Sequence, residues 1–141
     1  MSRIAVAEAF ERAPLLAERL GEGGGVDAII ARARAALAAM TEDERIAVLD
    51  AHPRIGSTAG LSARSAAEQG AATDGATLGK LERLNDEYER RFGFRFVVFV
   101  HGRSRAEIVP VLEARLRRSR DEELAAGLDE FLAIARDRLT R

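Results

Sequence analysis

A chain of 141 residues and 15.3 kDa is long enough for one domain to bury a core without a disulfide or a structural metal. It contains no cysteine, which excludes a disulfide framework, a thiolate nucleophile and a zinc knuckle and favours a reducing compartment. The 22 lysine and arginine residues nearly balance 23 acidic residues, and the formal net charge of -1 provides no basic field that would attract nucleic acid.

Neither end of the chain shows a targeting or membrane signal. Acidic residues and arginines recur every few positions through residues 1–20, so no apolar run there is long enough for a signal peptide or a membrane span. The last residues, RDRLTR, match no peroxisomal or retention tripeptide. We therefore expect a cytoplasmic protein without a membrane partner.

The first part of the chain is predicted to be helical. Alanine, leucine, arginine and glutamate dominate, and apolar residues recur at spacings of three and four, which is typical of amphipathic helices. Pro14 splits the opening stretch into two helices, and the glycines of residues 21–25 end the second. A third helix is expected over roughly Val26 to Met40.

Capping boxes predict where later helices begin. Thr41 with Glu44 begins a fourth helix, which ends near Ala51, and Ser62 caps another over Ala63 to Ala72. The approach to the amphipathic run LERLNDEYERRF is then loosened by Gly75 and Gly79. Two further capping boxes, Ser104 with Glu107 and Ser119 with Glu122, begin the last two helices.

No repeat or domain boundary is visible, so residues 1–141 are expected to form one domain. The predicted class is all-α, a bundle of about seven to nine helices with one buried extended segment over residues 94–100.

That segment belongs to the run FGFRFVVFV, residues 92–100, whose aromatic and β-branched residues favour a strand. No other part of the chain offers a partner strand, and a lone strand leaves its backbone groups unpaired. Two explanations remain open: a second subunit pairs with it, or its N–H groups face a bound anion or carbonyl. We favour the second, because such ligands satisfy backbone N–H groups well.

His52, in the stretch AHPRIGS, is the first candidate for chemistry. Pro53 biases His52 away from the helical region, so the preceding helix stops there and the imidazole lies at its negative carbonyl end. The alternatives are a histidine that only hydrogen-bonds the last carbonyls and an acid or base that works near neutral pH.

A second group lies in SARSAAEQ, where Ser65, Glu68 and Gln69 share one helix face beside small alanines. The alternatives are an exposed polar face and a site for a small polar substrate. On the final helix Arg138 lies about 60° from the centre of the apolar stripe and Arg136 about 100° away, so Arg138 is the arginine better aimed at the interior. It either snorkels at the rim of the core or binds a carboxylate or ureido group.

Other chemistry is poorly supported. His101 with Gly102 has the pattern of a structural turn, and no pair of histidines has metal-ligand spacing, so no metal is expected. The sequence contains no G-x-S-x-G, P-loop or dinucleotide fingerprint, so no nucleotide cofactor is expected either.

Four stretches in a fixed order, HPRIG, SARSAAEQ, LNDEYERRFGFRFVVFVHGRS and RLRRSRDEELAAGLDEFLAIARDRL, make the chain resemble the OHCU decarboxylase family. OHCU is 2-oxo-4-hydroxy-4-carboxy-5-ureidoimidazoline, an unstable intermediate of urate breakdown. The resemblance implies an all-α carboxy-lyase without a cofactor, usually a homodimer, that converts OHCU to (S)-allantoin and carbon dioxide in purine catabolism.

The resemblance also implies which residues form the site. The catalytic residues would be His52 and Glu68, with Pro53 contacting the substrate. The other substrate-binding residues would be Ser65, Gln69, Arg138 and the backbone of Val97, Val98, Phe99, Val100 and His101. The sequence departs from the family in two places: Arg95 stands where the family often has proline, and the stretch between Gln69 and Leu84 is a few residues short.

Two other functions remain open on the sequence. One is a non-catalytic helical binding module in which residues 94–100 dock a partner chain by strand addition, which would depend on that segment and not on His52. The other is a degenerate family member that works together with a hydrolase of the preceding step.

Overall fold

The computed structural model describes residues 24–55 and 75–140. Within them the protein is all-α, without a strand, as the sequence predicts. The five helices of these residues are α3 (Val26–Ala39), α4 (Glu42–Asp50), α6 (Gly75–Phe92), α7 (Arg105–Arg115) and α8 (Arg120–Leu139). The expected total of seven to nine helices is not confirmed, because the helices predicted before residue 21 and over Ala63–Ala72 lie outside the described residues.

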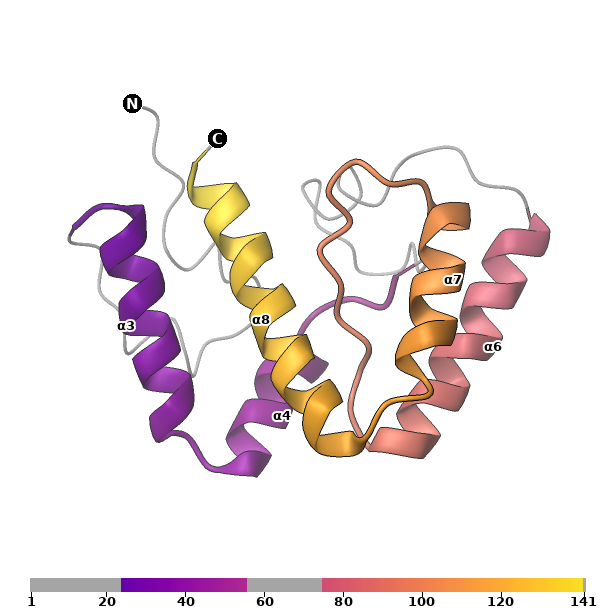
Figure 1. Cartoon of the computed structure of the whole chain (residues 1–141), viewed down its shortest axis with the longest axis horizontal. Coiled ribbons are helices and arrows are strands. Elements are labelled where there is room, and N and C mark those ends of the chain that lie inside the picture. The colour runs from indigo at the N-terminus through magenta and orange to yellow at the C-terminus, as the bar shows by residue number, and fades with distance from the viewer. Residues whose placement is uncertain (1–23, 56–74, 141) are drawn as a thin grey trace.

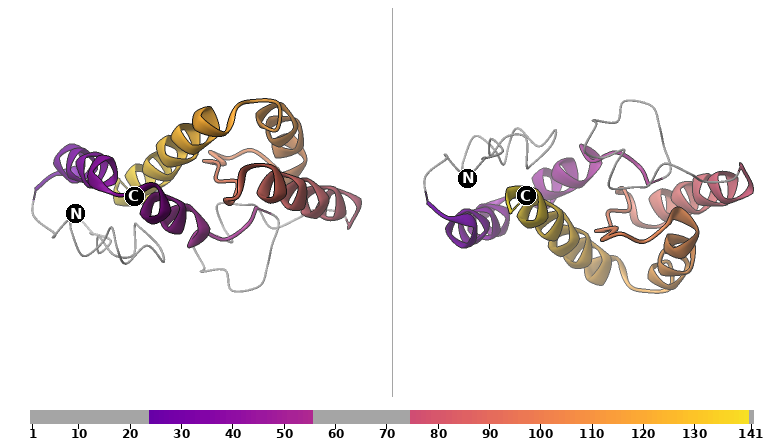
Figure 2. Two further views of the ribbon diagram at one scale, coloured as in Figure 1. Left: turned by 90° about the horizontal axis from the view of Figure 1, so that it is seen from below. Right: turned by 90° about the horizontal axis from the view of Figure 1, so that it is seen from above.

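Helix α8 lies in the middle of the arrangement. It packs against α3 and α4, and α6 packs against α7. The extended segment after α6 runs between α8 and the pair formed by α6 and α7 (Figure 1). Helices α6 and α7 run in the same direction because the segment that joins them returns along their length, and the two further views agree with this layout (Figure 2). None of the described helices has both the length and the apolar character needed to cross a membrane.

The three predicted helix starts are confirmed with their hydrogen bonds. The side chains of Thr41, Ser104 and Ser119 each accept from the backbone N–H three residues later, at 3.2 Å in every case. The glutamates at those later positions accept in return from the backbone N–H of the capping residue, at 3.0–3.1 Å. Each box therefore satisfies two N–H groups that a helix start leaves unpaired.

The start of α6 differs from the prediction. Gly75 and Gly79 lie inside the helix and do not loosen its approach. Helix α6 begins at Gly75 and continues into a face that buries Leu81 and Tyr88 completely, and this burial outweighs the roughly 1 kcal/mol that the interior Gly79 costs relative to alanine.

The extended segment, residues 94–100, forms no strand with any described residue, and most of its side chains are buried. The predicted buried extended segment is therefore confirmed. Phe94, Phe96 and Val97 are at most 2% exposed. The ring of Tyr88 on α6 packs against Phe96 at 5.3 Å and against Phe92 at 4.6 Å between centroids. Aromatic packing therefore fixes this segment against α6.

Arginine side chains bind the backbone of the segment in place of a neighbouring strand. Arg115 donates to the carbonyl of Val97 at 2.7 Å. Arg103 donates to the carbonyls of Phe99 at 2.6 Å and Val100 at 3.0 Å. This solution was missed at the sequence level, where only a second subunit or a bound ligand was considered.

A buried ion pair joins the segment to the helices. Glu123 of α8 is 0% exposed and accepts from the hydroxyl of Tyr88 and from Nε of Arg115, both at 2.7 Å. The guanidinium of Arg115 also lies over the ring of Phe96, at 4.6 Å from its centroid. Burial, together with the hydrogen bond to Glu123, raises the pKa of Tyr88, so its hydroxyl remains a donor at any physiological pH.

Glu123→Gln should lower the free energy of unfolding by about 3 kcal/mol or more, because it leaves the Arg115 charge buried without its counter-ion. Tyr88→Phe should cost only about 1 kcal/mol, since the ion pair survives the loss of one hydrogen bond. Urea denaturation measures both. Equal losses in the two variants would contradict the leading role of the charge pair.

Glu122 should make stability depend on pH. A hydrogen bond from the Ser119 backbone N–H lowers the pKa of Glu122 in the folded protein, so its contribution is present above the unfolded pKa, about 4.3, and is lost as the pH falls through the folded value. Glu122→Gln should therefore have a lower melting temperature than the wild type at pH 7, and the difference should shrink as the pH falls below the unfolded pKa and through the folded one. Glu87→Gln, at an exposed position within α6, is the control and should show no such change.

Candidate active site

His52 lies where the sequence predicts, at the end of α4. The helix ends at Asp50, and the last turns are closed by bonds from the N–H of Ala51 to the carbonyl of Ala47 and from the N–H of His52 to that of Leu49. Pro53 then prevents the helix from continuing. His52 is 8% exposed, so its imidazole is buried.

The imidazole of His52 faces α8. It meets the ring of Phe131 edge to face, with centroids 6.5 Å apart and an interplanar angle of 82°. Phe131 is two helical turns before Arg138, on the same face of α8, because seven residues make about two turns. His52 and this face of α8 therefore border one interior region.

Arg138 is 1% exposed, whereas Arg136 is exposed and pairs with Asp27 at 2.6 Å. The prediction that Arg138 is the arginine directed to the interior is confirmed. Burying a guanidinium without partners costs much free energy, so a buried arginine requires groups that bind it. Arg138 can therefore act as a structural residue or as a binding group for an anion.

The loop after His52 is fixed to α6. Nε of Arg54 donates to Glu89 and a terminal nitrogen donates to Asp86, both at 2.7 Å. The hydrogen bond to Glu89 raises the pKa of Arg54 above its usual value. The buried side-chain amide of Asn85 donates to the carbonyl of Ile55 at 3.1 Å, so α6 binds the loop at two successive residues.

The end of the extended segment lies next to α8. Arg103 and Arg115 bind its carbonyls, while the N–H groups of Val97, Val98 and Val100 have no hydrogen-bond partner among the residues that the structure describes. The N–H of Phe99 makes one long contact, 3.4 Å to Glu130 of α8. Backbone donors of this kind suit carbonyl or carboxylate oxygens of a ligand.

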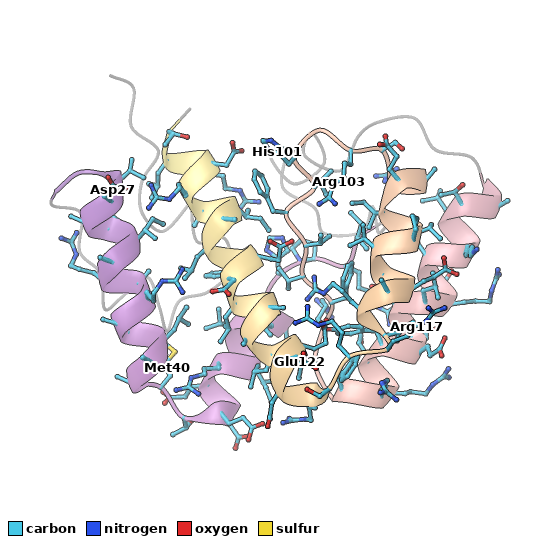
Figure 3. The ribbon with its side chains drawn as sticks, in the orientation of Figure 1. Asp27, Met40, His101, Arg103, Arg117 and Glu122 are labelled. Carbon is cyan, nitrogen blue, oxygen red and sulfur yellow. The ribbon has the colours of Figure 1, made fainter. Side chains whose placement is uncertain are left out.

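His101 and Gly102 form the predicted turn. Both have positive φ, 49° and 78°, and the exposed ring of His101 packs on Phe99 at 4.9 Å between centroids. Figure 3 shows His101 and Arg103 together at one end of the segment, whereas Glu122 lies at the opposite end of the molecule. The turn leaves the ring of His101 exposed, which is consistent with a contribution to the site from the backbone of His101 alone.

Three of the predicted residues, Ser65, Glu68 and Gln69, lie outside the described residues. The structure therefore does not test whether they meet His52. It adds residues that the sequence did not single out for the site, namely Asn85, Arg103, Glu130 and the contacts of Arg95. Only Arg95 had a signal, as a departure from the family pattern.

Comparison with known proteins decides the family. The family model described as OHCU decarboxylase matches residues 3–140. The chain belongs to the OHCU decarboxylase family.

Relatives in this family include the 2-oxo-4-hydroxy-4-carboxy-5-ureidoimidazoline decarboxylase of Haloferax volcanii, 32% identical over 96% of this chain and 84% of that protein. A uric acid degradation bifunctional protein of Bacillus subtilis is 36% identical over 72% of this chain, which corresponds to 21% of its own length. This chain thus matches one part of that longer protein.

The fold of the OHCU decarboxylase family is also found by structural comparison. An OHCU decarboxylase crystallised in the presence of (S)-allantoin superposes with a TM-score of 0.77 at 22% identity, covering 97% of this chain and 96% of that one. An (S)-allantoin synthase superposes with a TM-score of 0.73 at 20% identity, over 96% of this chain and 47% of that one. At these identities the agreement establishes the fold.

Asn85→Ala should release the loop that follows His52. The carbonyl of Ile55 would lose its buried donor, and we expect a loss of about 1–3 kcal/mol in unfolding free energy. Amide hydrogen exchange should become faster at Arg54 and Ile55 than in the wild type. Leu84→Ala, a neighbour on α6 that makes no hydrogen bond to the loop, is the control; equal acceleration in both variants would contradict a specific role for the amide.

Proposed function

We propose that this protein is a decarboxylase of urate degradation that converts OHCU to (S)-allantoin and carbon dioxide. The match of the OHCU decarboxylase model to residues 3–140 carries this proposal. It is supported by a relative of that name at 32% identity and by the burial of His52 and Arg138 around one interior region.

The substrate supplies its own electron sink. When the bond between C4 and the carboxylate breaks, carbon dioxide leaves and the electron pair on C4 delocalises into the adjoining C=N bond of the ring. To give allantoin, C5, the ring carbon that carries the ureido group, and the ring nitrogen of that C=N bond must each gain a proton, while the 4-hydroxyl loses its proton and becomes the C4 carbonyl. The enzyme therefore has to orient the carboxylate, stabilise the charge on the ring and deliver one proton to one face.

We assign the proton transfer to His52, first as a base toward the 4-hydroxyl and then as the general acid toward C5, the carbon that carries the ureido group. A positioned acid or base typically contributes about 10²–10⁴ in rate. The imidazole is held between a helix end and the ring of Phe131, so it can reach the substrate from one side only. Delivery of the proton from one side accounts for a single enantiomer of allantoin.

Substrate binding is assigned to groups around this imidazole. Arg138 would hold an anionic or carbonyl oxygen, and the N–H groups along Val97 to His101 would donate to the ring. Following the family pattern, Pro53 contacts the substrate, Ser65 and Gln69 hydrogen-bond its oxygens, and Glu68 orients His52 or the ureido N–H groups. Donors and acceptors of both kinds are needed, because the substrate carries both.

The protein is further proposed to act as a cytoplasmic homodimer with one catalytic domain, without a metal or an organic cofactor. The homodimer and the absence of a cofactor follow the family pattern. The cytoplasmic location is proposed because the sequence contains no cysteine, which favours a reducing compartment.

The binding-module alternative fits the structure poorly. Strand addition needs an exposed edge with free carbonyls and N–H groups. Phe94, Phe96 and Val97 are buried, and arginine side chains already bind the carbonyls along the segment. We therefore do not retain this alternative.

Circular dichroism during coupled urate oxidation tests the proposal. The wild-type protein should accelerate the appearance of one allantoin enantiomer, because spontaneous decay of OHCU is slow and racemic. No acceleration by the wild type would exclude the decarboxylase and leave a degenerate family member as the explanation.

In the same assay His52→Ala should reduce the enzymatic rate by about 10²-fold or more, with its helical circular dichroism unchanged. Glu68→Ala should also be severe. His101→Ala should be mild, because only the backbone of that residue is assigned to the site. Near-normal activity in His52→Ala, or equal losses in Glu68→Ala and His101→Ala, would contradict this assignment.

A further inference from the structure

We propose that Arg95 is a positioning residue that holds the backbone of His52 in its working place. The inference rests on the proposed role of His52 and concerns the position where this chain departs from the proline that is frequent in the family. Arg95 lies on the extended segment, and His52 lies at the end of α4, 43 residues earlier in the chain.

Arg95 makes three hydrogen bonds to the end of α4. One guanidinium nitrogen donates to the carbonyl of His52 at 2.8 Å and to that of Asp50 at 2.9 Å. The backbone N–H of Arg95 donates to Oδ1 of Asp50 at 2.9 Å. A proline at this position could make none of them, because it has neither the N–H nor a donor side chain.

These bonds act at a place where the chain would otherwise move. The last carbonyls of a helix have no partner within it, and Pro53 prevents another turn from covering them. Arg95 satisfies the carbonyl of Asp50, the last residue of α4, together with that of His52 just beyond the helix, and so ties His52 to the extended segment. Both sides of the proposed site are thereby held by one residue.

Arg95 is itself held in place. Its Nε lies 3.9 Å from Glu89, the carboxylate that also binds Arg54 at 2.7 Å. Arg54 of the loop after His52 and Arg95 of the extended segment thus share one carboxylate on α6, that of Glu89. This arrangement limits the freedom of the Arg95 side chain, which a positioning role requires.

The chain provides a matched control. Arg45 binds the end of α3 in the same way, with donors to the carbonyls of Leu37 at 2.7 Å and Ala38 at 2.9 Å. Among the described residues, Arg45 makes no hydrogen bond or ion pair with His52 or with the extended segment. Removing Arg45 therefore removes the same chemistry from a helix end outside the site.

The test uses the full chain and the allantoin assay. Arg95→Met should reduce kcat about 10–100-fold while changing KM by less than about threefold, because the loss affects orientation of the acid rather than substrate binding. Arg95→Lys keeps a cationic donor and should recover most of kcat. Arg45→Met should keep kcat at the wild-type value. Asp50→Asn, which keeps the acceptor for the Arg95 N–H, should be closer to wild type than Asp50→Ala.

A second readout does not need activity. The chain has only two histidines, so in a His101→Asn background the imidazole proton signals in NMR come from His52 alone. Arg95→Met should shift and broaden them, and Arg45→Met should leave them unchanged.

Unchanged kcat and unchanged His52 signals in Arg95→Met would overturn the proposal. So would a loss that Arg95→Lys does not recover and that Arg45→Met reproduces, because this would mark a general effect on stability. If the wild type itself forms no excess of one enantiomer, the proposed function fails, whereas the NMR comparison still decides whether Arg95 positions His52.

Discussion

The buried pair of Arg115 and Glu123 is the interaction on which the rest of this structure depends. Glu123 is completely buried, and Arg115 and Tyr88 are the groups that bind its Oε1. A second nitrogen of Arg115 binds the carbonyl of Val97. An uncompensated charge in this position would be costly, so α6, α7, α8 and the extended segment have to be in place together. The geometry of the proposed site therefore depends on this buried pair, because the site lies between the same elements.

Arginines take the place of a neighbouring strand at the end of the segment and also bind the end of α6 that precedes it. Besides Arg103 and Arg115, Arg120 at the start of α8 donates to the carbonyl of Phe92 at 3.0 Å. Each guanidinium carries several donors in a rigid plane and can bind carbonyls that differ in direction. This explains how a run with strand composition remains extended and buried in an all-α protein.

The sequence predicted those parts of the fold that depend on local rules. The helix predicted over Val26 to Met40 is Val26–Ala39 in the structure, because periodicity and flanking residues decide it. The capping boxes depend on residues three apart, and the inward direction of Arg138 follows from helical geometry. The arginine bonds join residues 18 and 43 apart and have no local pattern. In the candidate site, Pro53 was enough to predict that His52 lies at a helix end. The contacts of Asn85 and Arg95 became visible only in the folded structure.

The arginine contacts also leave the backbone of the segment with mainly N–H donors to offer to a ligand. Arg103 and Arg115 donate to the carbonyls of Val97, Phe99 and Val100, so among residues 97–100 only the carbonyl of Val98 accepts no hydrogen bond from a described residue. A molecule lying along this stretch meets donors nearly everywhere. A flat ureide would have to turn its oxygen-rich edge toward the segment, because its N–H edge would find almost no acceptor. In the proposed site, the backbone of the segment would therefore favour one of the two orientations of such a ring.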